Sequence, residues 1–260
     1  MNNYCLLLVG VILFISPPSS AQFPSLRGTD TRTSAPDVVM ADKKDWGVDM
    51  GFGGSFNRGN VDVNYLYSSF NLFKAWSPST AYLSGSTIYN TFGDIRTLNQ
   101  GTLTARYDHR IAGPWKIFVY NTNAYNEFIR LNYRATNGAG PWYDVAWGPM
   151  KHGLSVALTQ EYEKFKGGII ERAGRVSFRD VCQIPVSQVA VVRTDFFYVP
   201  KMNEMGDYHL FVDVSLQTMI WKDKLGLKLS WIDEYDNRPK PGVKPNDALW
   251  LTSLTLSFGE

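Results

Sequence analysis

The feature that most constrains the fold is a strict alternation of bulky apolar residues with small or polar ones, first evident in WGVDMGFGGSFNRGNVDVNYLY, residues 46–67. The apolar positions are Trp46, Val48, Met50 and Phe52, and between them lie Gly47, Asp49, Gly51 and Gly53. After the turn-like NRGN, the apolar positions are Val61, Val63, Tyr65 and Tyr67, and the others are Asp62, Asn64, Leu66 and Ser68. A period of two residues predicts β-strands with one apolar face.

The same alternation recurs almost to the end of the chain, and amphipathic helical patterns are nearly absent. We therefore expect an all-β protein, a single antiparallel up-and-down barrel of about 12 strands, because bacterial single-chain membrane barrels use an even number. After the two strands above, the predicted strands are Ala81–Tyr89, Arg96–His109, Trp115–Tyr125, Phe128–Gly140, His152–Tyr162, Arg172–Gln183, Gln188–Val199, Tyr208–Trp221, Leu225–Trp231 and Trp250–Phe258.

The N-terminus has the features of an export signal. An apolar run over Cys5–Ile15 is followed by small residues that end at Ala21, which predicts a signal peptide over residues 1–21. A retained membrane anchor is the alternative, but the run is short for a span. Residues 22–43 are rich in Ser, Thr, Pro and Asp and predict a flexible segment before a barrel domain over residues 44–260. No later apolar stretch reaches spanning length, so membrane insertion would require a barrel.

Charge and cysteine content exclude several function classes. The chain has 26 Lys and Arg against 24 Asp and Glu, and the basic residues do not cluster, so we expect no nucleic-acid partner. After signal cleavage Cys182 is the only cysteine, which excludes an intramolecular disulfide and a thiol metal site. No residue spacing indicates a metal ligand set, and we expect no cofactor.

The predicted connections fall into two sets that alternate along the chain. One set is mostly short and carries Trp at four of its five members: Lys74–Ser79, Arg110–Lys116, Gly140–His152, Gln183–Gln188 and Trp221–Lys224. Its middle member, with Trp142 and Trp147, is the one long exception. The other set is mostly longer and more polar. Short periplasmic turns, longer outer loops and interfacial aromatics are typical of outer-membrane barrels. The Trp-marked end is therefore expected to be periplasmic and to hold both termini.

The orientation of the two faces separates a membrane barrel from a soluble one. The polar face is rich in Gly, Ser, Asn and Thr with both signs of charge, whereas soluble outer faces tend to be rich in Lys and Glu. The apolar face carries Trp and Tyr near strand ends and almost no charge, and a lipid-facing charge at mid-depth costs roughly 2–4 kcal/mol. We expect the apolar face to point toward lipid. The alternative is a soluble periplasmic β-barrel or sandwich that binds an apolar ligand inside.

Three segments resemble the YdiY-like family of salt-induced outer-membrane proteins, whose molecular function is unknown. They are GFGGSFNRGNVDVN (Gly51–Asn64), NEFIRLNYRATNGAG (Asn126–Gly140) and EYDNRPKPGVKPNDALWLTSLTLSF (Glu234–Phe258). The last segment carries the most specific pattern, in the loop from Tyr235 to Asp247. The resemblance implies a β-barrel in the outer membrane of a Gram-negative bacterium. It implies no particular ligand or reaction.

Histidines and possible nucleophiles give no enzymatic pattern. His109 and His152 fall at the predicted periplasmic turns, and His209 lies on the polar face of a strand, four residues from Asp213. A hydrolase needs a nucleophile, a base and an orienting group in contact, and no nucleophile motif is present. We expect the protein not to be an enzyme, and His209 to be a hydrogen-bonded residue of the barrel interior.

Charged residues on the predicted inner face are the candidate functional residues. They are Asp49, Asp62, Arg106, Asp108, Glu161, Arg175, Arg179, Arg193, Asp195, His209 and Asp213. Because isolated charges in a confined interior are costly, we expect these groups to pair. They could form a structural ladder that fills a narrow barrel, or they could set the selectivity of a small pore. The expected role is therefore envelope integrity or restricted passage of small solutes, with outer-membrane lipid and the barrel-assembly machinery as partners.

Overall fold

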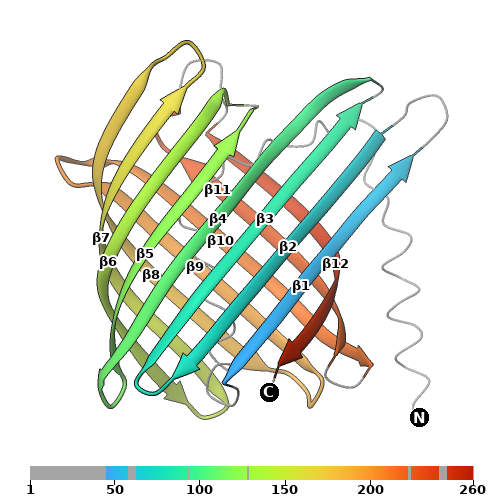
Figure 1. Cartoon of the computed structure of the whole chain (residues 1–260), viewed down its shortest axis with the longest axis vertical. Helices are drawn as coiled ribbons and strands as arrows, with labels where there is room; N and C mark the ends of the chain where they lie inside the picture. Colours follow the sequence, from blue (N-terminus) through green and yellow to red (C-terminus); the bar gives the residue numbers. More distant parts are fainter. Residues whose placement is uncertain are drawn as a thin grey trace.

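The computed structural model describes residues 45–57, 63–92, 94–127, 129–221, 224–239 and 245–259. Within these residues the chain forms twelve strands in one closed antiparallel barrel, as the alternation predicted (Figure 1). The strands are β1 (Trp46–Asn57), β2 (Val63–Trp76), β3 (Ser79–Phe92), β4 (Ile95–Ala112), β5 (Trp115–Asn126), β6 (Leu131–Trp147), β7 (Met150–Phe165), β8 (Ile170–Pro185), β9 (Ala190–Lys201), β10 (Glu204–Trp221), β11 (Leu225–Asp236) and β12 (Asn246–Gly259). The predicted signal peptide, the segment 22–43, Val61 and Asp62 lie outside the described residues.

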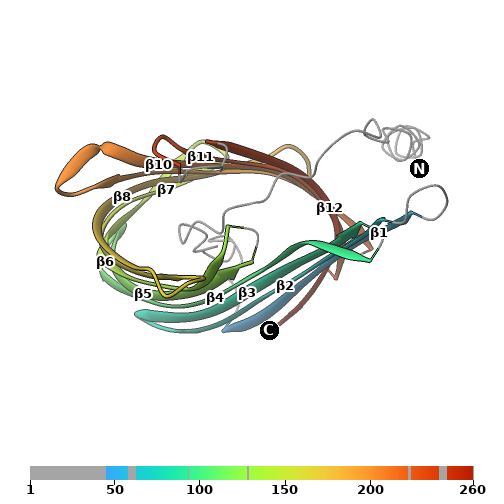
Figure 2. The ribbon, with the colours of Figure 1, turned by 90° about the horizontal axis from the view of Figure 1, so that it is seen from above.

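Each strand pairs with its sequence neighbours, and the first and last strands close the ring. Val48 in β1 lies opposite Leu72 in β2 on one side and opposite Phe258 in β12 on the other. Closure satisfies the backbone groups that an open sheet would leave unpaired at its edges, which a span through lipid requires. Figure 2 shows the ring of strands from above, with β3 on one wall and β10 and β11 on the opposite wall.

Several strands run further than the alternation predicted, and one predicted connection is wrong. Gly140–His152 was expected to be a long connection, but β6 continues to Trp147 and β7 begins at Met150. Pro141 lies opposite Ile117 of β5 inside the ladder. It has no backbone N–H to donate, but the strand continues through it. The turn is made instead at Gly148, whose φ of 58° is costly for other residues.

The outer face of the barrel is apolar and the inner face is mainly polar. Phe52 is 51% exposed, Val119 52% and Leu158 62%, whereas Arg106 is 5% exposed and Thr122 is fully buried. This distribution is the reverse of a soluble barrel and is that of a transmembrane one. The predicted orientation of β1 is confirmed, because Trp46, Met50 and Phe52 are exposed on the outside.

Strand β2 is an exception, because its predicted apolar face was wrong. Tyr67 lies opposite Gly53 of β1, in phase with the inner residue Asp49, so Tyr65 and Tyr67 face the interior. The outward positions include Leu66, which is 44% exposed. The sequence of β2 alternates acceptably in either phase, and pairing with β1, whose inner face is largely glycine, selects the phase that places the two rings inside.

The interior contains two apolar clusters in addition to polar groups. The larger one joins opposite walls of the ring and consists of Ile88, Phe197, Val199, Phe211, Ile232, Leu249 and Leu251, with Tyr65 and Tyr67 against it. The smaller one consists of Phe118, Trp142, Ala157 and Val181, with Tyr120 against it. Trp142 was expected near a periplasmic turn, but it is 1% exposed inside the barrel. Side chains therefore fill much of the lumen.

Five exposed tryptophans gather at one end of the barrel. The end at which β1 begins and β12 finishes also holds the predicted Trp-marked turns, and its exposed indoles are Trp46, Trp76, Trp115, Trp147 and Trp221. We call it the short-turn end, and the opposite end the loop end. None of the described residues forms a helix that is long and apolar enough to cross a membrane.

Candidate functional site: the barrel lumen

Arg106 and Asp108 form the first of two buried ion pairs in the short-turn half of the lumen. They are two residues apart on β4, so both side chains face inward. Arg106 Nε lies 2.6 Å from Asp108 Oδ1, and Nη2 lies 3.0 Å from Oδ2. The guanidinium stacks 4.3 Å above the Phe118 ring and 4.9 Å from the Trp142 ring. The pair is thus bidentate and covered by aromatic surface, which holds the charge in one place.

Arg179 of β8 forms a similar pair, which also neighbours Trp142. Its Nε lies 2.8 Å from Asp195 Oδ1 and its Nη2 lies 2.5 Å from Oδ2. The guanidinium lies 4.6 Å from the Phe197 ring and 5.8 Å from the Trp142 ring. Arg193 Nη2 approaches Asp195 at 3.8 Å. We call Phe118, Arg106, Trp142, Arg179 and Phe197 the arginine–aromatic partition.

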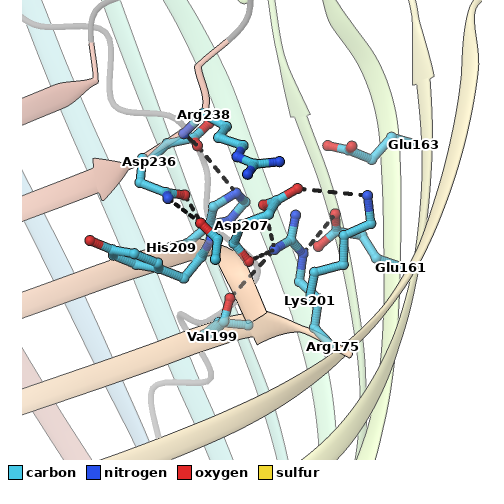
Figure 3. A network of polar contacts seen from close by, with 12 residues as sticks. Glu161, Glu163, Arg175, Val199, Lys201, Asp207, His209, Asp236 and Arg238 are labelled. Atoms are coloured by element: carbon cyan, nitrogen blue, oxygen red, sulfur yellow. Dashed lines mark hydrogen bonds and ion pairs between the residues drawn. The ribbon is translucent and has the colours of Figure 1, made fainter. Parts of the chain in front are cut away.

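A second polar network lies at the loop end (Figure 3). Arg175 Nη1 lies 3.2 Å from Asp207 Oδ1 and 3.4 Å from the Val199 carbonyl oxygen, and its Nε lies 3.8 Å from Glu161 Oε1. Lys201 Nζ lies 3.6 Å from Asp207 Oδ2. These contacts join β7, β8, β9 and β10 where the strands leave the apolar band.

The network continues around the rim with His209, Asp236 and further pairs. His209 Nε2 lies 3.7 Å from Asp236 Oδ1, so its carboxylate neighbour is not Asp213, the acidic residue on its own strand. Two further ion pairs at this end are Arg134–Glu163, which is buried, and Arg238–Glu204, which is exposed.

Beside the partition lies a polar cavity of about 160 Å³ that Arg193 and Asp195 help to line. Its charged lining residues are Asp49, Arg193, Asp195, Asp213 and Lys228. Most of the remaining wall carries hydroxyl or amide groups, from Ser69, Asn71, Ser84, Ser86, Thr102, Ser215, Gln217, Ser253, Thr255 and Ser257. The cavity meets the larger apolar cluster at Phe211, Ile232 and Leu251. Both signs of charge and many hydroxyls make it a suitable place for water or a small polar solute.

The structure brings most of the candidate residues into two groups. Arg106, Asp108, Arg179, Arg193 and Asp195 gather at the partition, while Glu161, Arg175 and His209 belong to the loop-end network. Asp49 and Asp213 line the cavity, and Asp213 lies directly opposite Asp195 in the β9–β10 register. Arg106, Arg175 and Arg179 each lie against a carboxylate, as expected from the sequence, whereas no such pair forms at Asp213 among the described residues.

Sequence reasoning missed several residues of the lumen. Arg134 and Glu163 were missed although Glu163 continues the period-two phase of Glu161, a signal that could have found it. Lys201 and Asp207 fell in a predicted loop that is largely strand. No sequence signal indicated the roles of Phe118 and Trp142, because the arginines that they contact lie on other strands, β4 and β8.

One cluster on the outer face has the composition of a nucleophilic site. Cys182 Sγ lies 3.5 Å from His152 Nε2, and His152 Nδ1 lies 3.2 Å from Asp180 Oδ1. Cys182 pairs with His152 of β7 and with Thr194 of β9, so the backbone amides around the thiol are committed to the sheet. Acyl transfer needs donors for the developing oxyanion, and these strands provide none.

The residues that the structure describes offer no metal centre. His109 Nδ1 lies 2.9 Å from Ser79 Oγ near the short-turn end, where the ring also neighbours Tyr107. Across the part of the chain that the structure describes, no three His, Cys, Asp or Glu side chains converge in a way that could hold a metal ion.

Comparison with solved structures finds barrels of low sequence identity. The NanC porin is 11% identical with a TM-score of 0.46, covering 82% of this chain and 97% of that one. The KdgM porin is 11% identical with a TM-score of 0.44, covering 82% and 99%. The translocator domain of the autotransporter NalP from Neisseria meningitidis is 13% identical with a TM-score of 0.41, covering 83% and 87%. Similarity at this level bears on no function.

Sequence comparison assigns the family. No curated protein matches the chain. A family described as "Protein of unknown function, DUF481" matches residues 50–258, which run from within β1 to within β12. This match agrees with the family resemblance drawn from the three segments above. The chain therefore belongs to the DUF481 family of proteins of unknown function.

Proposed function

We propose that this protein resides in the outer membrane of a Gram-negative bacterium and gives small polar solutes restricted passage through its lumen. The observation that carries the proposal is the polar cavity of about 160 Å³ bordering a partition of buried ion pairs. A barrel that served only as a scaffold would gain more from filling this space with apolar side chains. Hydroxyls and both signs of charge instead provide a wet, adaptable lining.

The cavity limits the size of any solute. A volume of this size has room for several water molecules. A sugar or an amino acid would need neighbouring side chains to move. The proposed passage is therefore selective for size first, and for hydrogen-bonding capacity second.

The partition acts as the closed gate of this passage. Arg179 and Asp195 each satisfy the other's charge, and Phe197 and Trp142 cover the guanidinium, so water has little access to the pair. Separating a buried pair is costly because each charge is left uncompensated. Conduction then requires a rearrangement of these side chains, and the resting barrel passes little.

Planar-bilayer recording of purified full-length protein tests the proposal. The double variant Arg179→Ala/Asp195→Ala removes both charges of one pair and much of the side-chain bulk, and we expect it to conduct several-fold more than the wild type. The matched control is Arg238→Ala/Glu204→Ala, which removes an exposed pair at the rim and should leave conductance unchanged. Equal conductance for all three proteins would contradict a gated passage.

A structural role in envelope integrity is the second candidate, and the filled lumen favours it. The two apolar clusters and the ion pairs stabilise a closed barrel whether or not anything passes. In this case wild type and both double variants would be electrically silent, and deletion of the protein would weaken the envelope without changing solute uptake.

Fractionation and a gel shift on boiling test the location, since a membrane barrel resists cold detergent.

A further inference from the structure

A row of amide side chains crosses the lipid-facing surface of the barrel. Asn121 of β5 lies opposite Asn137 of β6, and Asn137 lies opposite Gln160 of β7. All three share the outward phase with exposed apolar residues such as Val119 and Leu158. We call Asn121, Asn123, Asn137 and Gln160 the amide row. Its position is unusual, because a hydrocarbon environment cannot satisfy amide groups.

Aromatic residues place the amide row at membrane depth. On β5, Trp115 marks one boundary, where its ring lies 4.6 Å from that of Tyr143, and Tyr125 marks the other. At about 3.3 Å per residue and a tilt of about 40°, each residue advances roughly 2.5 Å along the membrane normal. The ten steps from Trp115 to Tyr125 then span roughly 25 Å, the height of a barrel's apolar band. Asn121 lies inside this band.

The amides satisfy one another only in part. Tyr133 Oη donates to Asn123 Oδ1 at 2.6 Å, Asn123 Nδ2 donates to Asn121 Oδ1 at 2.5 Å, and Asn121 Nδ2 donates to Asn137 Oδ1 at 2.9 Å. Each amide nitrogen carries two hydrogens. Among the described residues, the Asn137 amide nitrogen and the whole Gln160 amide group have no hydrogen-bond partner, and both residues are exposed. The series of hydrogen bonds thus ends at Asn137, and amide donors and one amide acceptor remain available on Asn137 and Gln160.

Small residues flank the row and make it accessible to another protein surface. Asn121 lies opposite Ala105 on its other side, and Gln160 lies opposite Gly174. Ala135 and Ala139 lie on either side of Asn137 in the outward phase of β6. Small side chains let backbones approach closely in a membrane. Across the strands, the amides of Asn121, Asn137 and Gln160 are therefore not covered by large neighbouring side chains.

We propose that the amide row is the contact surface of a homodimer in the membrane. Its open groups are complementary to themselves: under a two-fold axis the Asn137 amide of one copy donates to the Gln160 carbonyl of the other, and the reverse contact forms at the same time. Acyl chains offer no such groups, and lipid headgroups lie outside the apolar band. A second copy of this chain supplies both partners without any further component.

The test is the oligomeric state of the full-length protein in lipid vesicles. Energy transfer between donor- and acceptor-labelled copies is measured across a range of protein-to-lipid ratios. We expect association for the wild type, and at least a tenfold weaker association for Asn121→Leu/Asn137→Leu/Gln160→Leu. Thr252→Leu, an outward substitution on β12, is the control that should leave association unchanged. Heat-modifiability on a gel confirms that each variant is folded.

Cross-linking gives a second readout that locates the contact. In a Cys182→Ser background, Asn137→Cys should form a disulfide-linked dimer in vesicles, whereas Thr252→Cys should not. A wild type that stays monomeric at every ratio overturns the proposal. Association that survives the triple leucine substitution, or cross-linking at residue 252 in place of 137, overturns it as well. The proposal is independent of solute passage, since neither measurement involves conductance.

Discussion

Asp195 and Asp213 lie directly opposite each other in the β9–β10 register, inside the barrel. Asp195 is held by Arg179 through two contacts and approached by Arg193. Asp213 Oδ1 is buried and has no hydrogen-bond partner among the residues the structure describes. The negative charge of Asp195 is therefore balanced by arginines, whereas Asp213 has no such neighbour within the described part of the chain. The two residues lie where the cavity meets the partition.

Replacing Asp213 by Asn should stabilise the barrel, because like charges directly opposite each other in a sheet repel. We expect the free energy of unfolding to rise by roughly 0.2–1 kcal/mol, measured by urea titration in lipid vesicles. Asp49→Asn is the control and should give no gain, since Asp49 lies opposite Ser257 and Asn71. Destabilisation by Asp213→Asn would show that the repulsion is already offset.

Arg106 and Asp108 should behave as one unit. Replacing either by Ala leaves the other charge buried, at a cost of roughly 3–5 kcal/mol in the free energy of unfolding. The double variant should cost clearly less than the sum, because it leaves neither charge behind. A double-mutant cycle measures this coupling. Strict additivity would mean that each charge finds another partner in the lumen.

Gly153 should tolerate no side chain, since a Cβ there would lie 1.9 Å from Cζ2 of the Trp142 indole. Gly153→Ala would displace this ring, which neighbours both Arg106 and Arg179, at a cost of roughly 1–3 kcal/mol. Gly206→Ala is the matched control, because the nearest atom to its Cβ is at 4.0 Å. A change within about 0.5 kcal/mol is expected there. Equal effects of the two substitutions would contradict the tight packing of Trp142.

A lysine on the outer face should destabilise the barrel more the deeper it lies in the bilayer. Leu158, near the middle of β7, is 62% exposed, and Ile111, at the short-turn end of β4, is 61% exposed. Leu158→Lys should destabilise the barrel in vesicles by roughly 2–4 kcal/mol, and Ile111→Lys by roughly 0–1 kcal/mol. In a soluble protein both lysines would be harmless, so two small effects would contradict a membrane location.

Part of the lumen could be predicted from the sequence, because the period-two alternation places Arg106 with Asp108, and Arg175 with Arg179, on one face of a strand. The alternation does not say which arginine meets which carboxylate. Arg179 binds Asp195 of the next strand, whereas Arg106 binds a residue of its own strand. The difference arises from the register of neighbouring strands and from the space around Trp142.

The sequence by itself determined the strands, their number and the outward direction of most apolar faces, since these depend on local side-chain periodicity and on the cost of exposing charge to lipid. Only the tertiary structure decided that Tyr65 and Tyr67 point inward and that Trp142 contacts two guanidinium groups. It also decided that three amides align across β5, β6 and β7. The physical reason is that register and ring closure bring together residues from separate strands, whose contacts no local pattern encodes.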